Sequence, residues 1–565
     1  MQNKKIKKIS FITILLLAVT LIISSFTRDQ KLFQLNKNLD IYYSVIRELN
    51  SFYVDGIKPE KLIRTSIDDM LSTLDPYTTY IPESEMNDFK FMTDGEYAGI
   101  GAIIGQHDKD IIISEPYEGF PAQKAGLKAG DVLIKIDGKS TENMTTEQVS
   151  NHLKGKPNEI VNVKIQRPGK KKPLDINITR EKVQLDPVSY KGMLNNNTGY
   201  IYLTNFWEGC GDEVKKIFID LKRQGAKRLI LDLRSNPGGL LNEAVKIVNI
   251  FVPKGSEVVN TRGKMKQWDN DYKATEDPVD TIMPIAVLVN QGSASASEIV
   301  SGSLQDQDRA VIIGTRTFGK GLVQTTRDLG YDSKIKVTTA KYYIPSGRCI
   351  QALDYTHRNE DGSVGNVPDS LISKFKTGKG RIVYDGGGIV PDIKMESLSM
   401  STLSINLDRN FMYFDFATQY AISHKSIPSP DNFEITDNIY KEFKKFLEQK
   451  KFSYKTVTED ILEKMVEIAK KEKRYNDAKN EFSKLKEKIT PNLDNDLKEN
   501  EDEIKKFLTN EIVSRYYYQK GALQSTIKKD KTIEKALDVL SDSKTLSAVF
   551  ARGNVIKMES KKEKD

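Results

Sequence analysis

The sequence has 565 residues, which is enough chain for about three or four domains. Its 86 lysines and arginines and 78 aspartates and glutamates give a net charge of +8, spread over the whole chain. This excludes the concentrated basic surface of a nucleic-acid-binding protein. The hydrophobic fraction of 38% is sufficient to build cores and excludes a collagen-like or wholly disordered chain.

Two cysteines, Cys210 and Cys349, are too few for a disulfide framework, and their spacing is not that of a zinc site. They are either unrelated small apolar residues, which is the interpretation we favour, or the two ends of a single disulfide. Nothing else in the sequence indicates a metal, and we expect no organic cofactor.

The N-terminus has the pattern of an export signal, because four lysines precede an apolar run from Phe11 to Ile23. A run of about 13–15 apolar residues is shorter than the about 20 that a spanning helix needs. The following residues, 24–27, form a poor cleavage site. We therefore predict that residues 1–28 are a signal peptide or a retained anchor, with membrane contact only through residues 9–25. The rest of the chain would be exported, to the periplasm or to the outer face of the cytoplasmic membrane.

Two regions follow that differ in texture. Residues 32–93 repeat apolar side chains at helical spacing and predict an N-terminal helical region. Residues 96–182 change to short strands and glycine turns, with strands expected at 99–104, 111–113, 129–138 and 161–167. A helix is expected over 145–153, where Thr145 and Gln148 have the spacing of a capping box.

From 183 to 395 strands alternate with helices, which predicts a layered α/β core. Residues 228–233 and 285–290 are nearly continuous apolar runs, as expected for strands covered on both faces, and helices are expected over 240–251 and 297–305.

Residues 396–558 are poor in glycine and predict an all-helical extension, in which Thr456 and Glu459 have capping-box spacing. Its evenly mixed charges indicate solvated helix faces, and a homodimer interface, an adaptor-docking surface or a shield over the active-site entrance are its candidate roles. Residues 559–565 are expected to be a disordered tail.

The sequence does not favour a histidine-based catalytic triad, since the chain has four histidines and none lies in a segment that looks catalytic. It contains neither the zinc-binding motif HExxH nor the nucleophile motif GxSxG. The small-residue turn 290–298 follows a buried strand and precedes a helix. In such a turn Ser295 could attack a carbonyl while neighbouring amides hold the oxyanion. The alternative is that Ser295 or Ser297 only caps the helix.

A second glycine-rich turn, 314–324, places Lys320 between two glycines in an apolar context. Desolvation would lower the pKa of this lysine and allow it to take a proton from serine, at a cost of roughly 4 kcal/mol for a pKa near 7–8. The alternatives are a turn lysine or a contact to a phosphate or carboxylate. A P-loop is excluded, because no GxxxxGK[ST] pattern is present.

Together these two turns strongly resemble the tail-specific, carboxyl-terminal processing serine proteases of the S41 type. The resemblance implies that Ser295 is the nucleophile, Lys320 the general base and Gln324 the residue that orients the lysine. Residues 231–239 resemble the family's oxyanion turn, which implies a hole made by the amide of Ala296 and that of Gly238 or Gly239. That choice stays open, as does the alternative of a plain strand-to-helix turn.

Two further segments, 342–348 and 385–392, also resemble the family, with Cys349 where a serine is more usual. The implied fold is multidomain α+β: an N-terminal helical segment, a β-rich PDZ module, a crotonase-like layered protease core and an all-α C-terminal extension.

Residues 96–182 resemble a PDZ module, and the resemblance implies that Gly99, Ile100 and Gly101 form its carboxylate-binding loop. Such modules add a chain end as a strand and capture its carboxylate. The sequence therefore predicts a serine endopeptidase that acts through an acyl-enzyme on exported proteins with free, apolar, unstructured C-termini. The alternatives are a non-catalytic PDZ scaffold of the same fold and, disfavoured by the PDZ module, a small-ester or amide hydrolase.

Overall fold

The computed structural model describes residues 32–396 and 400–551. Residues 1–28 and 559–565, for which the sequence predicts a signal or anchor and a tail, lie outside the described residues. Within the described ranges, no helix is both long enough and apolar enough to cross a membrane. The chain divides into two compact units, Met1–Tyr80 and Ile81–Asp565, which are described separately.

The described part of the first unit, from residue 32 on, is mostly helical, as its apolar spacing predicts. Residues 32–52 form one helix and α2 (Pro59–Ser72) the next, with a proline in its first turn. The hydroxyl groups of Tyr42 and Ser66 are hydrogen-bonded to each other across the two helices. The only strand of the region predicted as helical is the short β1 (Thr79–Ile81), and α3 (Met86–Asp94) follows it in the second unit.

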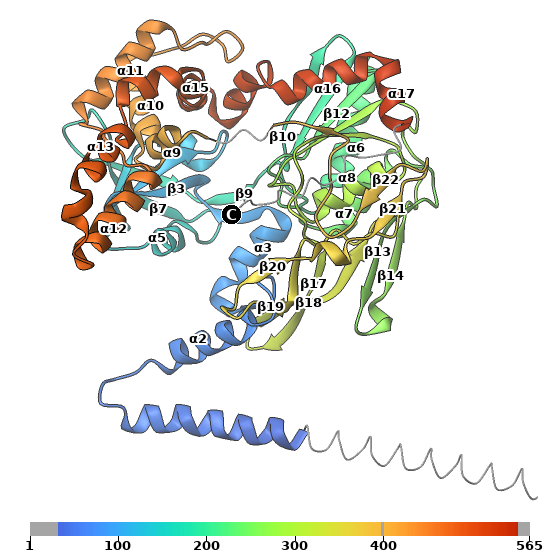
Figure 1. The fold of residues 1–565 in the computed structure, drawn as a ribbon, viewed down its shortest axis with the longest axis horizontal. Helices are drawn as coiled ribbons and strands as arrows, with labels where there is room; N and C mark the ends of the chain where they lie inside the picture. The colour runs from blue at the N-terminus through green and yellow to red at the C-terminus, as the bar shows by residue number, and fades with distance from the viewer. Residues whose placement is uncertain (1–31, 397–399, 552–565) are drawn as a thin grey trace, which may run out of the picture. The chain divides into compact units, whose positions relative to one another are not determined.

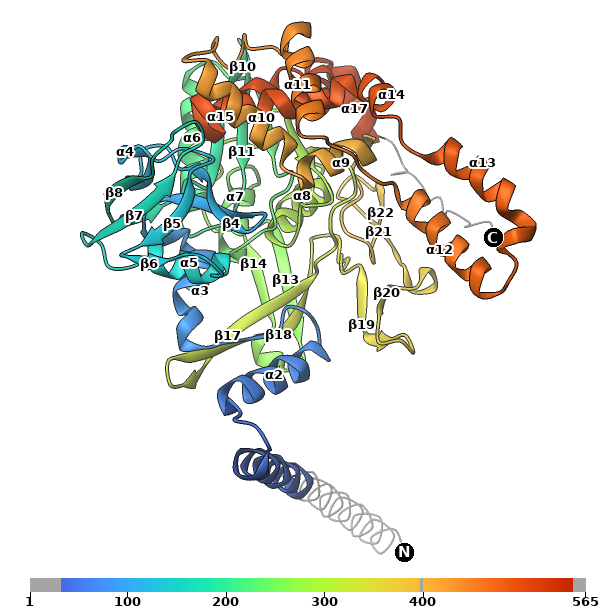
Figure 2. The same ribbon diagram turned by 90° about the vertical axis from the view of Figure 1, so that its left-hand side faces the viewer.

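The PDZ module is a six-stranded sheet in the order β3-β4-β5-β7-β8, with β6 beside β5, and two helices (Figure 2). A separate pair, β2 and β9, joins its two ends. The elements are β2 (Glu96–Gly99), β3 (Ala102–His107), β4 (Asp110–Pro116), α4 (Pro121–Lys124), β5 (Val132–Ile136), β6 (Lys139–Ser140), α5 (Thr146–Leu153), β7 (Ile160–Gln166), β8 (Leu174–Thr179) and β9 (Glu181–Gln184).

Two local predictions for this module have different outcomes. The capping box of α5 is confirmed, because Thr145 Oγ1 accepts from the Gln148 amide at 3.2 Å and Gln148 Oε1 accepts from the Thr145 amide at 2.9 Å. The single strand expected over 99–104 is wrong. Gly101 has φ 72°, a left-handed conformation that interrupts pleating, so the chain forms β2 and β3 on either side of a two-residue loop.

The protease core is built on a six-stranded sheet in the order β10-β11-β12-β15-β16-β23, parallel except for β10. Its strands are β10 (Val188–Asn195), β11 (Thr198–Leu203), β12 (Arg228–Asp232), β15 (Ile285–Val289), β16 (Val311–Gly314) and β23 (Ile393–Lys394). Helices α6 (Cys210–Arg223), α7 (Leu241–Asn249) and α8 (Ala296–Asp306) pack on one face (Figure 1).

The central strands are buried on both faces, as their apolar runs predict, but the second cover comes from an unexpected place. Tyr200, Ile230 and Leu288 pack there against Ile533 and Leu540, which belong to the C-terminal helices. The far end of the predicted helical extension therefore completes the layered core.

A second sheet pairs β17, β18, β13 and β14 in that order and carries residues next to the predicted active site. Its strands are β13 (Glu257–Gly263), β14 (Asn270–Lys273), β17 (Leu322–Gly330) and β18 (Ser333–Tyr343). Two small hairpins complete this region: β19 (Leu353–Arg358) with β20 (Val364–Asn366), and β21 (Lys374–Lys376) with β22 (Ile382–Tyr384).

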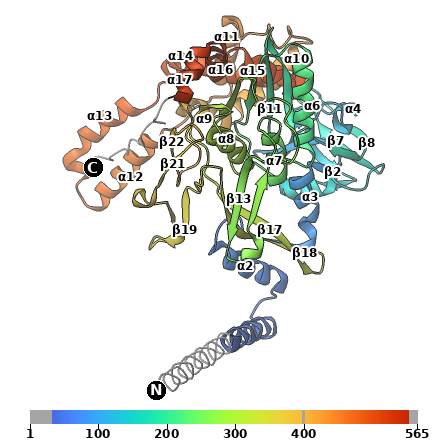
Figure 3. The same cartoon turned by 90° about the vertical axis from the view of Figure 1, so that its right-hand side faces the viewer.

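The C-terminal region is helical, as predicted. Its helices are α9 (Thr402–Arg409), α10 (Met412–Ser423), α11 (Asp437–Gln449), α12 (Val457–Lys471), α13 (Lys479–Ile489), α14 (Leu493–Glu499), α15 (Glu501–Ile527), α16 (Lys531–Ser541) and α17 (Ser543–Ala551). An aromatic-rich core joins α9, α10, α11 and α15, whereas α12 and α13 pair with each other (Figure 3). Short 3-10 turns lie at Glu83–Glu85, Lys266–Trp268, Asp369–Leu371 and Tyr475–Ala478.

Candidate active site

Ser295 lies at the strained turn between β15 and α8. Its backbone has φ 54° and ψ −113°, whereas a serine that only caps a helix has extended backbone. A non-glycine residue in such a conformation costs about 1–3 kcal/mol, and it persists only where the surroundings impose it. Ser295 is half-buried, whereas Ala294 before it and Ala296 after it are buried. In α/β-hydrolases a sharp, strained strand-to-helix turn exposes the nucleophile, and the Ser295 turn has the same kind of geometry.

The neighbouring serines have structural partners. The Ser293 hydroxyl donates to the Leu233 carbonyl at 2.8 Å, and the Ser297 hydroxyl donates to the Asn236 carbonyl at 2.9 Å. Both bonds fasten the turn to the loop that follows β12. Ser297 therefore does not act as the helix cap that the alternative interpretation required.

The turn is held by Glu298, a fully buried carboxylate that accepts four hydrogen bonds. Its Oε2 accepts from the amides of Ser295 and Lys320, both at 2.9 Å. Its Oε1 accepts from the Gly319 amide at 2.7 Å and the Thr317 hydroxyl at 2.5 Å. Burial raises the pKa of Glu298 to about 7, against the lowering effect of these four donors. One carboxylate thus links the Ser295 turn to the Lys320 loop.

The role of Glu298 was not predicted, although its spacing from Ser295 contains a signal for it. Ser295 and Glu298 have the Ser-x-x-Glu spacing of a capping box, in which the glutamate reaches back to the amide of the cap residue. The structure contains that return bond, from the Ser295 amide to Glu298.

Lys320 lies in the loop between β16 and β17, and it is half-buried. The Tyr342 hydroxyl donates to the Lys320 carbonyl and lies 3.2 Å from the Ser295 carbonyl, so a second residue joins the two turns. Gly319 has φ 87°, and a Cβ there would lie 2.4 Å from the Ala352 Cβ, so only glycine fits beside the lysine. The structure therefore brings Ser295 and Lys320 to one site.

Gln324, predicted to orient the lysine, lies on β17 opposite Thr338 of β18. Its side-chain amide donates to Thr338 Oγ1 at 3.2 Å. Its action on Lys320 stays a prediction.

The predicted oxyanion turn lies directly against Ser295. A Cβ added to Gly238 would lie 2.8 Å from the Ser295 Cβ and 2.9 Å from the Ala296 nitrogen. The Gly238 amide donates to Asn236 Oδ1 at 2.9 Å. Among the residues that the structure describes, the amides of Ala296 and Gly239 have no acceptor. The two glycines that the sequence left equivalent therefore differ, because the Gly238 amide is already hydrogen-bonded and the Gly239 amide is available as a donor.

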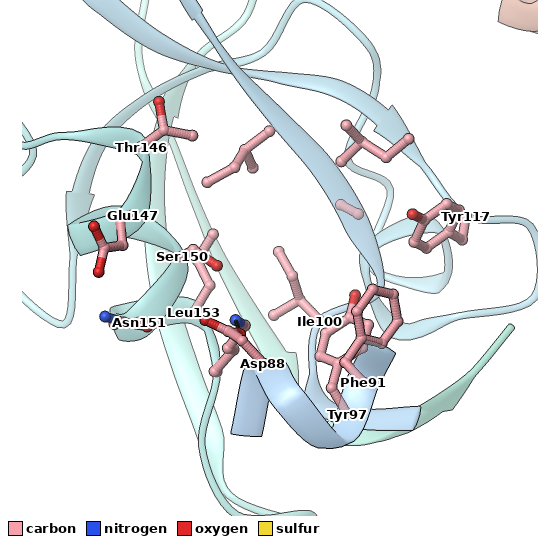
Figure 4. Close-up of a pocket in the computed structure, with 14 residues that line it drawn as sticks. Asp88, Phe91, Tyr97, Ile100, Tyr117, Thr146, Glu147, Ser150, Asn151 and Leu153 are labelled. Atoms are coloured by element: carbon pink, nitrogen blue, oxygen red, sulfur yellow. Dashed lines mark hydrogen bonds and ion pairs between the residues drawn. The ribbon is translucent and has the colours of Figure 1, made fainter. Parts of the chain in front are cut away.

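A pocket of about 420 Å³ lies between β3 and α5 of the PDZ module (Figure 4). The predicted carboxylate loop borders it, with Ile100 among the lining residues. The loop is fixed by its carbonyls, since Ile100 accepts from the Ala122 amide at 2.7 Å and Gly101 from the Tyr117 amide at 3.0 Å. The pocket is lined by Asp88, Phe91, Tyr97, Ile100, Ala102, Ile103, Ile104, Tyr117, Thr146, Glu147, Ser150, Asn151, Leu153 and Lys154.

The two remaining family-like segments, 342–348 and 385–392, support the C-terminal end of α8. Arg348, only 1% exposed, contacts Asp306 Oδ1 and Gln305 Oε1, both at 2.8 Å. Arg381 contacts Asp308 at 2.6 Å and also Asp392. These buried pairs fix the helix whose other end carries Ser295.

The cysteines lie apart from this site. Cys210 and Cys349 are both free thiols, so the disulfide left open by the sequence is wrong. Burial raises the pKa of each thiol, which makes both of them poor nucleophiles.

Comparison with known proteins agrees with this architecture. Residues 197–357 match peptidase family S41, residues 112–167 match the PDZ domain, and residues 403–540 match the C-terminal helical domain of probable PDZ-proteases.

Curated relatives extend the match along most of the chain. A probable CtpA-like serine protease of Staphylococcus aureus (strain bovine RF122 / ET3-1) is 33% identical over 476 residues, covering 81% of this chain and 91% of its own. Its counterpart in Staphylococcus haemolyticus (strain JCSC1435) is 34% identical over 405 residues, covering 71% and 78%. Among solved structures, a photosystem II D1 C-terminal processing protease is 29% identical, covering 63% of this chain and 92% of its own, with a TM-score of 0.35.

The family matches and the curated relatives define a serine peptidase that carries a PDZ domain. The chain belongs to peptidase family S41, among the CtpA-like carboxyl-terminal processing proteases. The family assignment, the enzyme class and the multidomain α+β fold predicted from the sequence are thereby confirmed.

Proposed function

We propose that this peptidase cleaves exported proteins whose unstructured C-terminal tails end in apolar residues, with the PDZ groove holding the tail while Ser295 attacks. The observation that carries the catalytic part is the pair of turns, Ser295 and Lys320, joined through Glu298. The apolar floor of the PDZ pocket, which includes Ile100, Ile104 and Leu153, supports the preference for an apolar tail.

In the proposed reaction, neutral Lys320 takes the proton of the Ser295 hydroxyl as Oγ attacks the scissile carbonyl carbon. Lys320 then gives that proton to the leaving amine, and the C–N bond breaks to leave an acyl-enzyme. Water, deprotonated by the same lysine, hydrolyses the ester and restores Ser295. Gln324 is proposed to orient the lysine amine throughout.

The oxyanion is proposed to bind the amides of Ala296 and Gly239. The Ser295 amide is directed to Glu298 and the Gly238 amide to Asn236, which leaves the other two as donors. Gly238 contributes by lacking a side chain, because a Cβ there would reach the Ala296 nitrogen. Preorganised donors of this kind each contribute about 10²–10³ in rate.

Export is proposed from the N-terminal sequence, in which lysines precede the apolar run ending at Ile23. The substrates would then be other exported proteins, met in the periplasm or at the outer face of the cytoplasmic membrane. Membrane contact would be limited to residues 9–25. Fractionation of cells that produce the full chain, combined with protease accessibility of the region after Arg28, tests this location. A chain found in the cytosol would contradict it.

The function is tested by incubating the enzyme and its Ser295→Ala variant with an unfolded reporter that ends in apolar residues. The same reporter ending in Asp-Asp is the matched substrate. We expect cleavage by the wild type only, faster for the apolar tail. Lys320→Arg should be inactive although it keeps the charge, because arginine cannot serve as a neutral base. Turnover by either variant would contradict the proposed Ser295–Lys320 dyad. Equal cleavage of the two reporters would contradict selection of the tail by the PDZ module.

A further inference from the structure

Lys154 lies at the carboxylate-binding end of the PDZ pocket. It follows α5 directly, and the next residue, Gly155, donates its amide to the Ala98 carbonyl at 3.3 Å. A Cβ added to Gly99 would lie 3.7 Å from the Leu153 carbonyl. The end of α5 therefore lies against the loop that the sequence predicts to receive a terminal carboxylate, and the Lys154 side chain lines the pocket beside it.

The ammonium group of Lys154 is paired with the carboxylate of Asp88, which comes from α3, outside the PDZ sheet. Asp88 also lines the pocket. The two side chains are 48% and 26% exposed, Asp88 first, so the pair lies at the open rim. A carboxylate thus already lies on a cation at the end of the groove that a peptide carboxylate would enter.

The groups beside Asp88 have the other features of a chain end. Figure 4 shows Phe91 and Tyr97 together with Asp88 and Leu153 at one end of the pocket, and Thr146 at the other. The rings of Phe91 and Tyr97 pack edge to face with centroids 5.4 Å apart. These rings line the end of the pocket that lies at the loop.

The Tyr97 ring lies against the loop, because a Cβ added to Gly99 would lie 2.9 Å from its Cε2 atom. Burial raises the pKa of the Tyr97 hydroxyl, and the amides of Ala102 and Gly101 oppose that rise. A carboxylate on Lys154 and aromatic rings at the same end of the pocket are two of the contacts that a chain end with an apolar last residue would make there.

From this arrangement we infer that Lys154 binds the terminal carboxylate of the substrate tail, and that Asp88 holds this lysine while the pocket is empty of substrate. The inference rests on the proposed function and adds to it a binding residue outside the glycine loop. Its ligand class is a peptide with a free α-carboxylate and an apolar last side chain. Entry of the tail exchanges one carboxylate for another on the same ammonium group, and the Asp88 carboxylate that it displaces is exposed to solvent.

If the Asp88–Lys154 pair only held α3 in place, removal of Asp88 would weaken tail binding, whereas the inference predicts that it strengthens tail binding. Exposed ion pairs contribute little to stability, and α3 has other attachments. The Leu185 amide donates to the Gly95 carbonyl at 3.1 Å, and a Cβ at Gly95 would lie 2.5 Å from the Trp207 ring. Removing Asp88 should therefore release Lys154 for the ligand without releasing α3. If the pair served only to hold α3 against the end of α5, its loss would weaken tail binding.

The test measures binding to the full chain carrying Ser295→Ala, which prevents cleavage. The probes are a fluorescein-labelled peptide ending in Ala-Leu-Val with a free carboxylate and the same peptide as its C-terminal amide, followed by anisotropy. In the Ser295→Ala background, Lys154→Met should weaken binding of the free acid about tenfold and leave the amide unchanged. Asp88→Asn should strengthen binding of the acid about threefold and again leave the amide unchanged. Lys156→Met, at an exposed lysine two positions further on, is the matched control and should change neither.

Equal binding of acid and amide before substitution, or weaker acid binding in Asp88→Asn, would overturn the inference while tail selection by the groove stands. If neither peptide bound, the proposal that the PDZ groove binds the tail would be wrong as well. Reporter cleavage by the enzyme with Ser295 intact is measured separately, and it shows whether the catalytic part of the proposed function still holds. Thermal unfolding of each variant distinguishes loss of the contact from loss of the fold.

Discussion

The protease core and the C-terminal helices differ in how they hold their charged groups. In the core, Glu298 and Arg348 are buried, and each is fixed by several partners at short distance. In the helices, pairs such as Lys455–Glu463 are exposed, with side-chain exposures of 56% and 43%. A buried group requires its partners in one geometry, whereas an exposed pair exchanges freely with water. Substitution should therefore be costly in the core and mild in the helices.

The boundary between these regions does not follow the order of the chain. Ile533 and Leu540 belong to the C-terminal helices but pack on the core sheet, so substitutions there should behave like core substitutions. What sets the cost of a substitution is therefore the environment of the residue, buried or exposed, and matched residues from each environment test this.

The largest effect is expected for Gly238→Ala, with Gly255→Ala as its control. Both glycines have positive φ, 98° and 87°, so both variants incur backbone strain. Only at Gly238 would the new Cβ meet Ser295 and Ala296, whereas at Gly255 nothing lies within 4 Å. We expect kcat to fall about 10²–10³-fold in Gly238→Ala and to stay near wild type in Gly255→Ala. Equal activities, after correction for the folded fraction, would place the oxyanion elsewhere.

The next largest effect is expected at Glu298, where stability and activity should change with pH in opposite directions. Burial raises the pKa of Glu298 from 4.5 to about 7. Its contribution to stability is therefore fully present below about pH 4.5 and is lost as the pH rises through about 7, a change of about 3 kcal/mol. Activity should rise over the same range, because the ionised carboxylate accepts all four donors.

In Glu298→Gln, stability and activity should no longer change in opposite directions with pH. An amide group cannot accept from every donor that Glu298 accepts from, so we expect kcat to fall about tenfold to a hundredfold. The activity step near pH 7 and the stability change between pH 4.5 and 7 should both disappear, leaving only the ionisation of Lys320. Thermal unfolding and kcat, each followed from pH 4.5 to 9, measure the two trends. A variant that keeps the wild-type step near pH 7 would show that Glu298 does not produce it.

The same contrast explains how far the sequence predicts the molecule. Ser295 could be found because its turn is local: a buried strand, small residues and a helix in succession. Glu298 was missed because three of its four donors lie on Thr317, Gly319 and Lys320, about twenty positions away. The spacing from Ser295 to Glu298 shows a capping box but not a contact to a second loop.

For helices and strands too, the sequence predicts local features better than contacts between distant segments. The apolar runs of β12 and β15 predict burial on both faces, yet they do not name α16 and α17 as the second cover. The strand pattern alone runs through the loop between β2 and β3, which only the PDZ resemblance predicted, because Gly101 has a positive φ and a glycine in a strand-like run does not reveal its own φ. Periodicity predicts which face is buried, and only the fold shows what buries it.

A smaller effect, on stability alone, is expected when a buried and an exposed charge are compared. Arg348→Met should destabilise the protein by about 3–5 kcal/mol, because it leaves the buried carboxylate of Asp306 without its partner. Lys455→Met, at an exposed pair of the C-terminal helices, should not change stability measurably. Chemical denaturation of both variants at pH 7 measures the difference. Similar losses in the two would mean that burial does not decide the cost.

The smallest effects are expected at two helix caps, which compare a complete capping box with a partial one. In α5 the bonds between Thr145 and Gln148 run in both directions. In α12 the Thr456 hydroxyl accepts from the Glu459 amide at 3.2 Å, but the Glu459 carboxylate accepts from Thr490 instead. Thr145→Ala should cost about 1 kcal/mol and Thr456→Ala about half as much, seen as faster amide exchange in the first turns of α5 and α12. The expected difference comes from the reciprocal bond, since loss of the threonine hydroxyl frees the glutamine side chain that it helps to position. Equal losses would assign the whole effect to the threonine, and the second residue of the box would then contribute to specificity of the helix start rather than to its stability.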